Sequence, residues 1–528
     1  MMAAPMNATE AFVDANIRAG RGESPAIVDA ASNRTITYRE VLAQVNRTGH
    51  ALRRLGIRAE ERVMLLLPDV PEFAFAFFGA IKIGAVVVPV NTLLKPHDYE
   101  YLLNDSRARA LVVHASLLPL IEPLQSSLRH LQHLLVVGAE HGAASYAAML
   151  AAEDENLTAE PMSDDDAAFW LYSSGTTGFP KGAIHLQHDM TCCAESFARG
   201  VLGITAADRT FSVARLFFAY GLGNALYFPF YVGATTILHP GRPEPRLVFD
   251  VVARHKPTLF YSVPTSYAAM LAAMDAGTQA DFSSVRLCSS AGEPLAASLY
   301  ERWRARTGVE ILDGIGSTEV LHTFLANRAG RVRPGSSGEI VPGYEARIVD
   351  ADGRDVPDGE IGDLLIKGES TCAGYWNRQE QSRRTICGEW IRTGDKYSRD
   401  ADGYFWYHGR SDDMLKVSGQ WVSPAEVEAA LITHAAVLEA AVVGREDTER
   451  LVKPMAFVVL KNGHTASVDL EHELQAHVKA RLAPYKYPRW VTFIDELPKT
   501  ATGKIQRYKL RALASSPASA PGEPPITT

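Results

Sequence analysis

Short apolar runs alternate with longer amphipathic segments from Arg62 to about Val349. Such alternation is typical of βαβ units, in which parallel strands are joined by helices that cover the sheet. The sequence therefore predicts an α/β fold with a mostly parallel sheet in a large N-terminal domain. The clearest apolar runs are Val63–Leu67, Ala110–Val113, Leu134–Val137 and Thr235–Leu238.

The pattern changes after Gly338, where short alternating strands are separated by Asp-Gly pairs that favour tight turns. We expect a smaller β-rich subdomain at about residues 338–409, within an N-terminal domain of residues 1–411. Helix patterns at Pro424–Leu431 and Asp469–Leu482, and strand patterns at Ala440–Val443 and Pro454–Leu460, predict a separate small α+β domain over residues 412–513. Residues 514–528, rich in Pro, Ser and Ala, are predicted to be a disordered tail.

Bulk properties exclude several classes of protein. A chain of 528 residues is too long for one hydrophobic core. Its formal net charge of -8 argues against a nucleic-acid partner. The five cysteines include no CxxC spacing, so neither a disulfide framework nor a zinc site is indicated, and a reducing cytoplasm fits best.

The most apolar stretch, Phe73 to Val90, is not expected to span a membrane. Lys82, Gly84 and Pro89 interrupt it, its first half has helical spacing, and its valine run favours a strand. We expect a core helix that leads into a core strand. The N-terminus has neither a basic region nor an apolar run, so a secretory signal is not expected.

A polar segment from Tyr172 to Gly182 lies between two apolar runs that predict strands, Ala167–Tyr172 and Ala183–Leu186. Its glycines let backbone N–H groups turn toward an anion, while hydroxyls and a lysine add donors and positive charge. An ordinary surface turn needs one glycine and seldom gathers these groups. The segment therefore predicts a loop that binds nucleotide phosphates through Ser173, Ser174, Gly175, Thr176, Thr177, Gly178 and Lys181.

A Walker A loop is the obvious alternative, but that motif requires Gly-Lys-Ser/Thr at its end. Here Lys181 follows Pro180 rather than a glycine. Gly182 stands where the Walker motif places its magnesium-binding hydroxyl. The segment is therefore predicted to be a phosphate loop of a different type.

A second glycine-rich segment, Asp313 to Glu319, follows an apolar run that predicts a strand. Gly314 and Gly316 let a flat ligand lie against the backbone. A carboxylate this close to glycines and hydroxyls suits a magnesium ion that carries phosphate oxygens. Taken alone, Glu319 could equally be an acidic residue at a helix N-terminus; beside a phosphate loop, the metal-binding interpretation is favoured.

Other segments carry residue types that suit the same chemistry. Asp395, in Trp390-Ile-Arg-Thr-Gly-Asp395, is expected at a strand end, where a carboxylate can accept both ribose hydroxyls, and Arg410 can pair with phosphate. Each alone would more often form a surface ion pair. Ser290-Ala-Gly-Glu-Pro294 is a weaker signal. Pro498-Lys-Thr-Ala-Thr-Gly-Lys504 ends in a lysine that would be merely solvated outside this pattern.

Together these motifs resemble the adenylate-forming superfamily, which includes acyl-CoA synthetases, the adenylation modules of peptide synthetases, and luciferases. The resemblance covers nearly all of the chain except its two termini. It implies that ATP is cleaved between its α and β phosphates. It also implies that the C-terminal domain is mobile and rotates about a hinge, matched here by Asp412, between two half-reactions.

The resemblance assigns roles to individual residues. Lys504 would enter the site during adenylation, Gly419 would lie on the face used in the second half-reaction, and Lys181 would guide the leaving pyrophosphate. Thr318 would contact the α-phosphate. Glu319 and Thr176 would bind magnesium. The remaining ATP-binding residues implied are Ser173, Ser174, Gly175, Thr177, Gly178, Gly292, Glu293, Pro294, Asp313, Gly314, Asp395 and Arg410.

The segments Phe217–Asn224 and Leu321–Phe324 are most similar to the benzoate and hydroxybenzoate CoA ligase family. Core packing alone would also account for the aromatic residues among them. Thr323 replaces an isoleucine typical of benzoate ligases; its hydroxyl could bond a ring substituent, or its methyl group could face inward. The acyl pocket implied by the resemblance consists of Ala219, Tyr220, Phe228, Gly316, His322 and Thr323.

We therefore expect an AMP-forming acid–thiol ligase for a small aromatic carboxylate, of the kind used to degrade aromatic compounds, with ATP, Mg²⁺ and coenzyme A. Coenzyme A is expected as the acceptor because too little chain follows Lys504 for a carrier domain. An enzyme that loads a separate carrier protein and a nonenzymatic nucleotide-binding homologue remain alternatives. Lysine acyltransferases and deacylases are conceivable partners at Lys504. The oligomeric state, monomer or homodimer, is not indicated.

Overall fold

The computed structural model describes residues 7–139, 144–173, 180–411, 413–417, 420–447, 451–499 and 505–515. The chain divides into two units. The first consists of Met1–Arg347, Leu365–Thr393 and Asp402–Phe405, and the second of Ile348–Leu364, Gly394–Ala401 and Trp406–Thr528. The boundary expected between residues 411 and 412 remains a prediction. Several predicted site residues lie outside the described ranges: Ser174, Gly175, Thr176, Thr177, Gly178, Asp412, Gly419 and Lys504.

The first unit contains two large sheets whose inner strands are parallel. Antiparallel strands close both edges of one sheet but a single edge of the other, whose last strand is parallel. This arrangement confirms the mixed α/β class with a large N-terminal part. The nine-stranded sheet has the order β15 (Glu339–Ile340), β14 (Thr323–Ala326), β13 (Ile311–Gly316), β12 (Leu287–Ser290), β11 (Leu259–Ser262), β9 (Arg209–Ser212), β10 (Thr235–Leu238), β1 (Pro25–Asp29) and β2 (Arg34–Thr37). The seven-stranded sheet has the order β18 (Gly374–Tyr375), β8 (Lys181–Leu186), β7 (Ala167–Ser173), β4 (Val86–Pro89), β3 (Arg62–Leu66), β5 (Ala110–His114) and β6 (His133–Val137).

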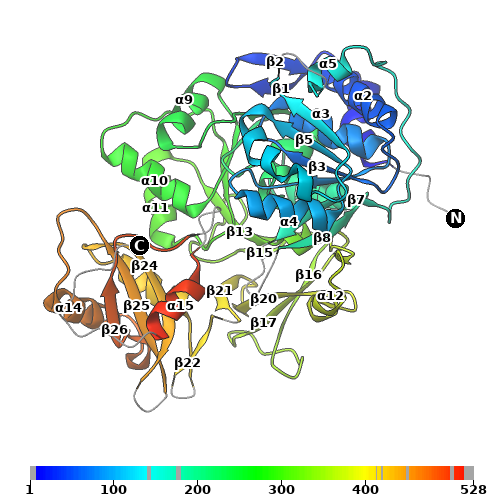
Figure 1. The fold of residues 1–528 in the computed structure, drawn as a ribbon. Helices are drawn as coiled ribbons and strands as arrows, with labels where there is room; N and C mark the ends of the chain where they lie inside the picture. The colour runs from blue at the N-terminus through cyan, green and yellow to red at the C-terminus, as the bar shows by residue number, and fades with distance from the viewer. Residues whose placement is uncertain are drawn as a thin grey trace. The chain divides into compact units, whose positions relative to one another are not determined.

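Helices connect and cover these strands, and α9, α10 and α11 lie next to one another (Figure 1). Their apolar faces meet the nine-stranded sheet in a core that includes Phe260, Tyr267 and Trp303. The helices of this unit are α1 (Ala15–Arg18), α2 (Tyr38–Arg54), α3 (Pro71–Lys82), α4 (Pro96–Ser106), α5 (Tyr146–Leu150), α6 (Asp189–Cys193), α7 (Ala219–Leu222), α8 (Phe228–Val232), α9 (Pro245–His255), α10 (Pro264–Asp275), α11 (Ala297–Thr307) and α12 (Gln379–Thr385).

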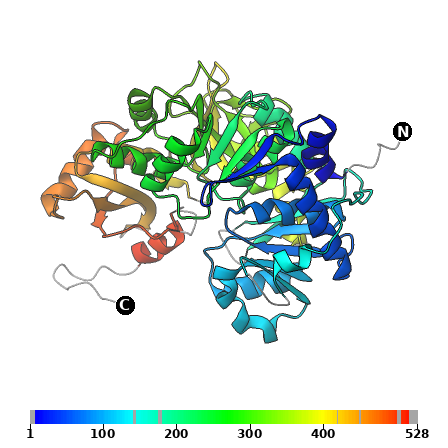
Figure 2. The ribbon, with the colours of Figure 1, turned by 90° about the horizontal axis from the view of Figure 1, so that it is seen from above.

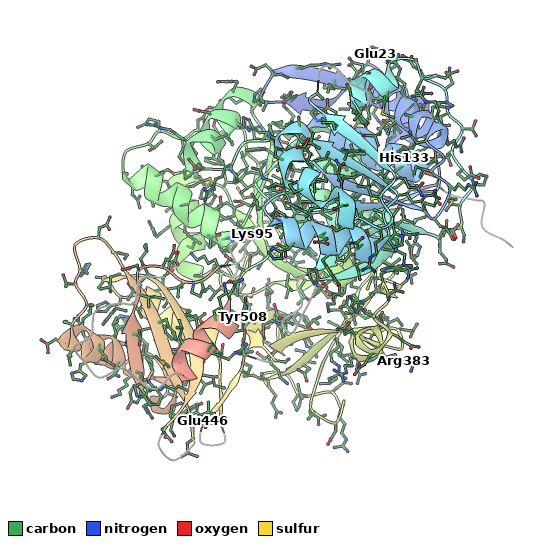
Figure 3. The ribbon with its side chains drawn as sticks, viewed as in Figure 1. Glu23, Lys95, His133, Arg383, Glu446 and Tyr508 are labelled. Carbon is green, nitrogen blue, oxygen red and sulfur yellow. The ribbon has the colours of Figure 1, made fainter. Side chains whose placement is uncertain are left out.

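Seen from above, the blue and cyan segments around the seven-stranded sheet form one group beside the green segments (Figure 2). Helix α3 leads into strand β4, as the apolar stretch from Phe73 to Val90 predicts, and both are buried. No helix in the described ranges is long and apolar enough to cross a membrane. Charged side chains such as Glu23 and Arg383 are exposed (Figure 3).

Short 3₁₀ and π segments complete these helices. Helix α6 continues into a π turn, and a second π turn joins α7 to α8. Such turns often occur at functional sites. The π segments are η1 (Glu10–Asp14), η4 (Ala194–Arg199) and η5 (Gly223–Tyr227), and the 3₁₀ segments are η2 (Ala115–Leu120), η3 (Glu122–Ser127), η6 (Thr318–Val320) and η7 (Pro484–Lys486).

Smaller sheets follow in the chain. A five-stranded sheet contains β16 (Glu345–Val349), β17 (Gly362–Lys367), β20 (Trp390–Arg399), β19 (Ile386–Cys387) and β21 (Phe405–Arg410). The rest of the second unit is a small α+β fold. Its elements are β22 (Leu415–Val417), β23 (Gln420–Val422), β24 (Val437–Glu446), β25 (Val452–Leu460), β26 (Trp490–Phe493), α13 (Pro424–Ile432), α14 (Val468–Lys479) and α15 (Arg507–Ser515).

An ion pair between Arg507 and Glu428 connects α15 to α13 in the second unit. Arg507 Nη2 lies 2.8 and 2.7 Å from the two carboxylate oxygens of Glu428 on α13, and Glu428 also accepts a hydrogen bond from the Val442 backbone. Burial alone would lower the pKa of Arg507, but the carboxylates of Glu428 and Asp413 outweigh it and raise the pKa. Removing either partner would leave the other charge buried and unpaired.

We expect Arg507→Met to destabilise the second unit by about 3 kcal/mol, because Glu428 would lose its counter-ion. Urea unfolding of the full chain, followed by circular dichroism, measures this loss. Arg511→Met is the matched control, since the Arg511 side chain is 40% exposed against 21% for Arg507; its expected cost is under about 1 kcal/mol. Equal losses in the two variants would contradict the prediction.

Candidate active site

The two strands that flank the predicted phosphate loop form an antiparallel pair in which Ser173 on β7 is opposite Lys181 on β8. This register brings the two ends of the loop together. The Ser173 hydroxyl oxygen is buried and has no hydrogen-bond partner in the part of the chain that the structure describes. A buried unpaired hydroxyl is costly unless something else satisfies it, so a polar ligand would be stabilised here.

Lys181 and Glu319, which are far apart in sequence, meet through Tyr375. The Lys181 ammonium donates to the Tyr375 hydroxyl at 2.7 Å, and that hydroxyl donates to Glu319 Oε1 at 2.6 Å. Lys181 Nζ also lies 3.7 Å from Glu319 Oε1. Burial, and then the negative charge of Glu319, raise the pKa of Tyr375, so its hydroxyl keeps its proton. The three side chains form a site with one cation, one anion and a shared hydroxyl.

The backbone places Glu319 in this site. Residues Thr318–Val320 form a 3₁₀ turn, capped by the Ser317 hydroxyl, which accepts a hydrogen bond from Val320 N at 3.2 Å. Gly316 precedes it, and a Cβ there would lie 2.4 Å from the His322 carbonyl oxygen. Only glycine therefore lets the chain turn back so closely after β13.

Asp313 and the segment Gly292–Pro294, both predicted to bind ATP, lie on or just after two adjacent strands. Asp313 on β13 is in register with Ser290 on β12, and Gly292 has a φ of +93°, a conformation that favours glycine. Burial raises the pKa of Asp313 to about 8, although the Ser290 hydroxyl and two backbone N–H groups oppose the rise. The carboxyl group is thus mostly uncharged at neutral pH, which suits a nucleobase better than a phosphate.

The residues expected at the acyl pocket gather around His322. Its ring centroid lies 4.5 Å from that of Phe228 and 5.5 Å from that of Tyr220. A Cβ at Gly223, in the π turn between α7 and α8, would lie 2.5 Å from His322 Cδ2, so this glycine makes room for the ring. Thr323 is buried on β14, and its methyl carbon lies near Gly314. Ala219 begins α7 beside Tyr220.

His322 is a neutral histidine with one unused nitrogen. Burial lowers its pKa to about 3. Its Nε2 lies 3.3 Å from the Tyr220 carbonyl oxygen, which can only accept, so Nε2 carries the proton. Nδ1 is then a hydrogen-bond acceptor; it is buried and has no partner among the described residues.

In the second unit, the structure brings together Asp395 and Arg410, the two residues predicted to bind the ribose and the nucleotide. Arg410 Nη1 donates to Asp395 Oδ1 at 3.1 Å. Asp395 lies inside β20 rather than at the strand end that the sequence suggests. Gly394 interrupts the regular strand with a φ of +76°, and a Cβ there would lie 2.7 Å from Arg410 Nη2.

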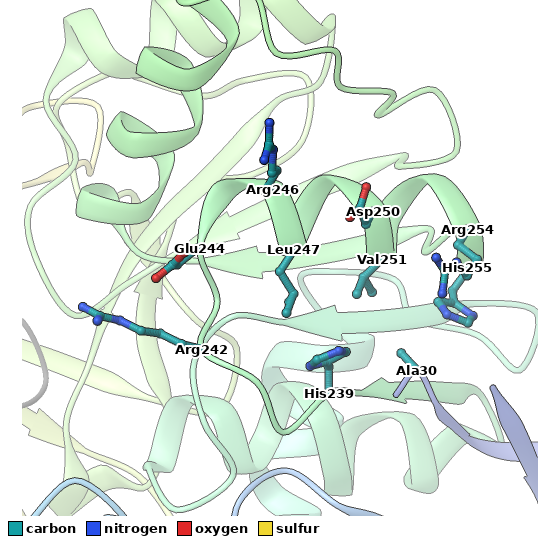
Figure 4. Close-up of a pocket in the computed structure, with 10 residues that line it drawn as sticks. All are labelled: Ala30, His239, Arg242, Glu244, Arg246, Leu247, Asp250, Val251, Arg254 and His255. Carbon is teal, nitrogen blue, oxygen red and sulfur yellow. The ribbon is translucent and has the colours of Figure 1, made fainter. Parts of the chain in front are cut away.

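A cavity of about 500 Å³ lies elsewhere in the first unit, along α9 (Figure 4). Its lining includes His239, Arg242 and Arg254 but none of the predicted site residues. It therefore plays no part in the site built around Lys181 and Glu319. Among the described residues, no cluster of three or more His, Cys, Asp or Glu side chains could hold a metal ion.

Sequence reasoning missed two residues that lie directly behind the site, Tyr375 and His185. Tyr375 stands in a two-residue strand whose only pairing is with β8, so no periodicity marks it. His185 donates to the Thr318 carbonyl oxygen at 2.8 Å. An alternating apolar strand with a histidine at an inward position could have indicated it.

Comparison with known proteins gives the same picture. Residues 14–376 match the AMP-binding enzyme family, and residues 426–504 match the AMP-binding enzyme C-terminal domain. The benzoate–CoA ligase of Thauera aromatica is 52% identical over 508 residues, 96% of each chain. The 4-hydroxybenzoate–CoA/benzoate–CoA ligase of Rhodopseudomonas palustris is 47% identical, covering 98% of this chain and 97% of that protein.

Among solved structures, the anthranilate CoA ligase AuaEII in complex with anthranoyl-AMP has a TM-score of 0.92 and 47% identity, covering 97% of this chain and 98% of that one. Fold and site together define an adenylate-forming ligase. Its first unit carries the two strands that flank the predicted phosphate loop, and its second unit contains the smaller α+β fold. The chain belongs to the AMP-binding enzyme family over both of its matched regions.

Proposed function

We propose that this chain is an ATP-dependent aryl-CoA ligase. It activates benzoate or a hydroxybenzoate as an acyl-adenylate and then transfers the acyl group to coenzyme A, with release of AMP and pyrophosphate. The observation that carries this proposal is the convergence of Lys181, Tyr375 and Glu319 at the end of the phosphate-loop strands. The activities named for the full-length relatives support the choice of acid and acceptor.

The charges of the site suit the first half-reaction. A benzoate oxygen attacks an α-phosphate that is itself negative, so negative charge grows on the phosphorus and the leaving pyrophosphate. Lys181 offsets part of that charge, and Lys504 is proposed to add a second cation. No general base is needed, because a carboxylic acid with a pKa of about 4 is already ionised at neutral pH.

Magnesium fits the same site. Glu319 offers a hard carboxylate oxygen, and a single such ligand suffices because Mg²⁺ usually takes its other ligands from phosphate oxygens and water. When bound, the ion supplies positive charge to the phosphates. We propose that Glu319 holds it together with Thr176, which lies outside the described residues.

The surroundings of His322 favour an aromatic ring that bears a hydrogen-bond donor. Tyr220, Phe228 and His322 offer flat faces to a ring, and Nδ1 of His322 is an acceptor with no partner among the residues that the structure describes. A hydroxyl or amino substituent could donate to it, whereas unsubstituted benzoate would leave it unpaired. Gly316 and Thr323 are proposed to complete this subsite.

We expect at least one hydroxy- or aminobenzoate isomer to exceed benzoate in kcat/KM by about tenfold, the effect of one hydrogen bond to a buried acceptor. A panel of benzoate and its hydroxy and amino isomers, assayed for thioester formation, measures this. His322→Phe keeps an aromatic ring but removes the acceptor, so it should abolish the preference. A preference for benzoate that His322→Phe leaves unchanged would contradict the assignment.

Assays with and without coenzyme A test the acceptor. Pyrophosphate release without a thioester would favour an enzyme that loads a separate carrier protein, and no pyrophosphate with any aryl acid would favour a nonenzymatic homologue. A cytoplasmic location, supported by the five free cysteines, belongs to the same proposal. We also propose that acylation of Lys504 inactivates the enzyme, because it would remove the charge of this lysine. Intact-mass spectrometry of the native protein tests for this modification.

A further inference from the structure

A buried histidine–aspartate pair lies behind the turn that carries Thr318 and Glu319. His185 on β8 and Asp189 at the start of α6 both have fully buried side chains. His185 Nδ1 lies 2.7 Å from Asp189 Oδ2, and His185 Nε2 lies 2.8 Å from the Thr318 carbonyl oxygen. The Phe169 ring stacks on the imidazole at 5.2 Å between centroids. The ring is thus held on both edges and one face.

The hydrogen-bond partners fix the orientation of this ring. The Thr318 carbonyl can only accept, so Nε2 donates to it. Nδ1 faces Asp189 Oδ2, which also accepts a hydrogen bond from the Leu186 backbone at 3.1 Å. A ring bound at both nitrogens cannot rotate without losing one of these two contacts.

His188 lies on the other side of the Asp189 carboxylate. His188 Nε2 lies 3.3 Å from Asp189 Oδ1. The two nitrogens of His188 also face the carbonyl oxygens of Asp164 at 2.8 Å and Glu369 at 3.0 Å. Burial alone would lower the pKa of His188, but these carbonyls and Asp189 outweigh it and raise the pKa. The hydrogens of His188 thus point at these carbonyls, and Asp189 Oδ1 has no hydrogen-bond partner among the described residues.

We propose that His185 is a positioning residue for the nucleotide site: held in place by Asp189, it fixes the Thr318 carbonyl and with it the turn that presents Thr318 and Glu319. The inference rests on the proposed function for the roles of those two residues. Strand β8 carries both Lys181 and His185, and each contacts the turn. Lys181 reaches the Glu319 side chain through Tyr375, and His185 binds the Thr318 backbone carbonyl. Without the hydrogen bond from His185 to the Thr318 carbonyl, Glu319 could move relative to Lys181.

Two variants and one control test the two contacts of the ring. His185→Gln keeps an N–H donor but loses the rigid ring that joins Asp189 to Thr318. Asp189→Asn keeps the side-chain shape but replaces a carboxylate oxygen with an amide group, which weakens the contact with Nδ1. His188→Gln is the matched control, because His188 does not touch Thr318. Circular dichroism and thermal unfolding identify any variant that fails to fold, and Asp189→Asn then carries the test alone.

Calorimetry of ATP binding at several magnesium concentrations is the first measurement. We expect His185→Gln to weaken MgATP binding and to raise the half-saturating magnesium concentration by about 10- to 100-fold, as the loss of a residue that orients a metal ligand does. His188→Gln should stay within about threefold of the unchanged protein. A purely structural histidine would lower the active fraction and leave the magnesium dependence unaltered, which would overturn the proposal.

Nitrogen-15 NMR of histidine-labelled protein is the second measurement, and subtracting the His185→Gln spectrum assigns the signals. We expect His185 Nε2 to carry a hydrogen that is bonded to the Thr318 carbonyl, and Asp189→Asn to shift the signals of both ring nitrogens. An Nε2 without a hydrogen in the unchanged protein would overturn the proposal. A chain that binds MgATP as described but forms no thioester would refute the proposed function and leave this inference standing.

Discussion

Lys504→Ala is expected to slow aryl-acid-dependent pyrophosphate release by about 10²- to 10³-fold, the cost of removing one preorganised donor from a transition state that gains charge. Thioester formation from supplied benzoyl-adenylate should be spared, because only the first half-reaction creates charge at the phosphates. Lys504 lies outside the described residues, so this prediction depends on the family resemblance and on the match of residues 426–504. Separate assays of the two half-reactions measure it.

A neighbouring lysine offers the control. Lys499 is bound to Glu439 at 2.7 Å and is partly exposed, so Lys499→Ala should change either half-reaction by less than about threefold. Gly419→Leu is the reciprocal variant, expected to impair thioester formation and to spare adenylation. Equal loss of both half-reactions in Lys504→Ala would refute a separate adenylating role for this lysine.

Glu319→Gln should reduce adenylation by about 10²- to 10³-fold, since an amide replaces the charged oxygen proposed to bind magnesium. The carboxylate also anchors the hydroxyl of Tyr375, which in turn holds Lys181, so the substitution releases two groups at once. Initial rates of pyrophosphate release over a range of magnesium concentrations measure the effect. Excess magnesium should recover only part of the lost rate.

Tyr375→Phe is the comparison that separates these two consequences. It removes the shared hydroxyl but keeps the carboxylate, so we expect a loss of only about tenfold and an unchanged magnesium requirement. If Tyr375→Phe matched Glu319→Gln in both respects, the carboxylate would act by holding Lys181 rather than by binding metal.

The sequence predicts elements well where local pattern and burial agree. Helix α3 and strand β4 follow from their apolar spacing, and β7 and β8 from the runs on either side of the glycine-rich loop. Helix α14 ends at Lys479, not at Leu482, because Pro484 disfavours helical geometry in the residues before it. Asp395 lies within β20 because Gly394 bends the strand without ending it.

Site residues were predictable where a motif carries them. Lys181 and Glu319 belong to glycine-rich segments with a chemical rationale, and the structure brings them within 3.7 Å of each other. Tyr375 was not predictable from the sequence, and His185 was marked only by its inward position on a strand, because their importance comes from pairing between strands and from a backbone carbonyl that the fold brings near. The roles assigned to the residues outside the described ranges stay predictions.

The edge of the nine-stranded sheet has a consequence for how the chain is made. Strand β1 pairs with β10, so Ile27 stands beside Thr236, roughly two hundred residues later in the chain. A ribosome adds about 5 to 20 residues per second, so the N-terminal hairpin waits on the order of ten to forty seconds for its partner strand. During that time the apolar face of Ala26 to Val28, fully covered in the finished protein, has no sheet to join. Newly made chains should therefore depend on chaperones until β10 has emerged.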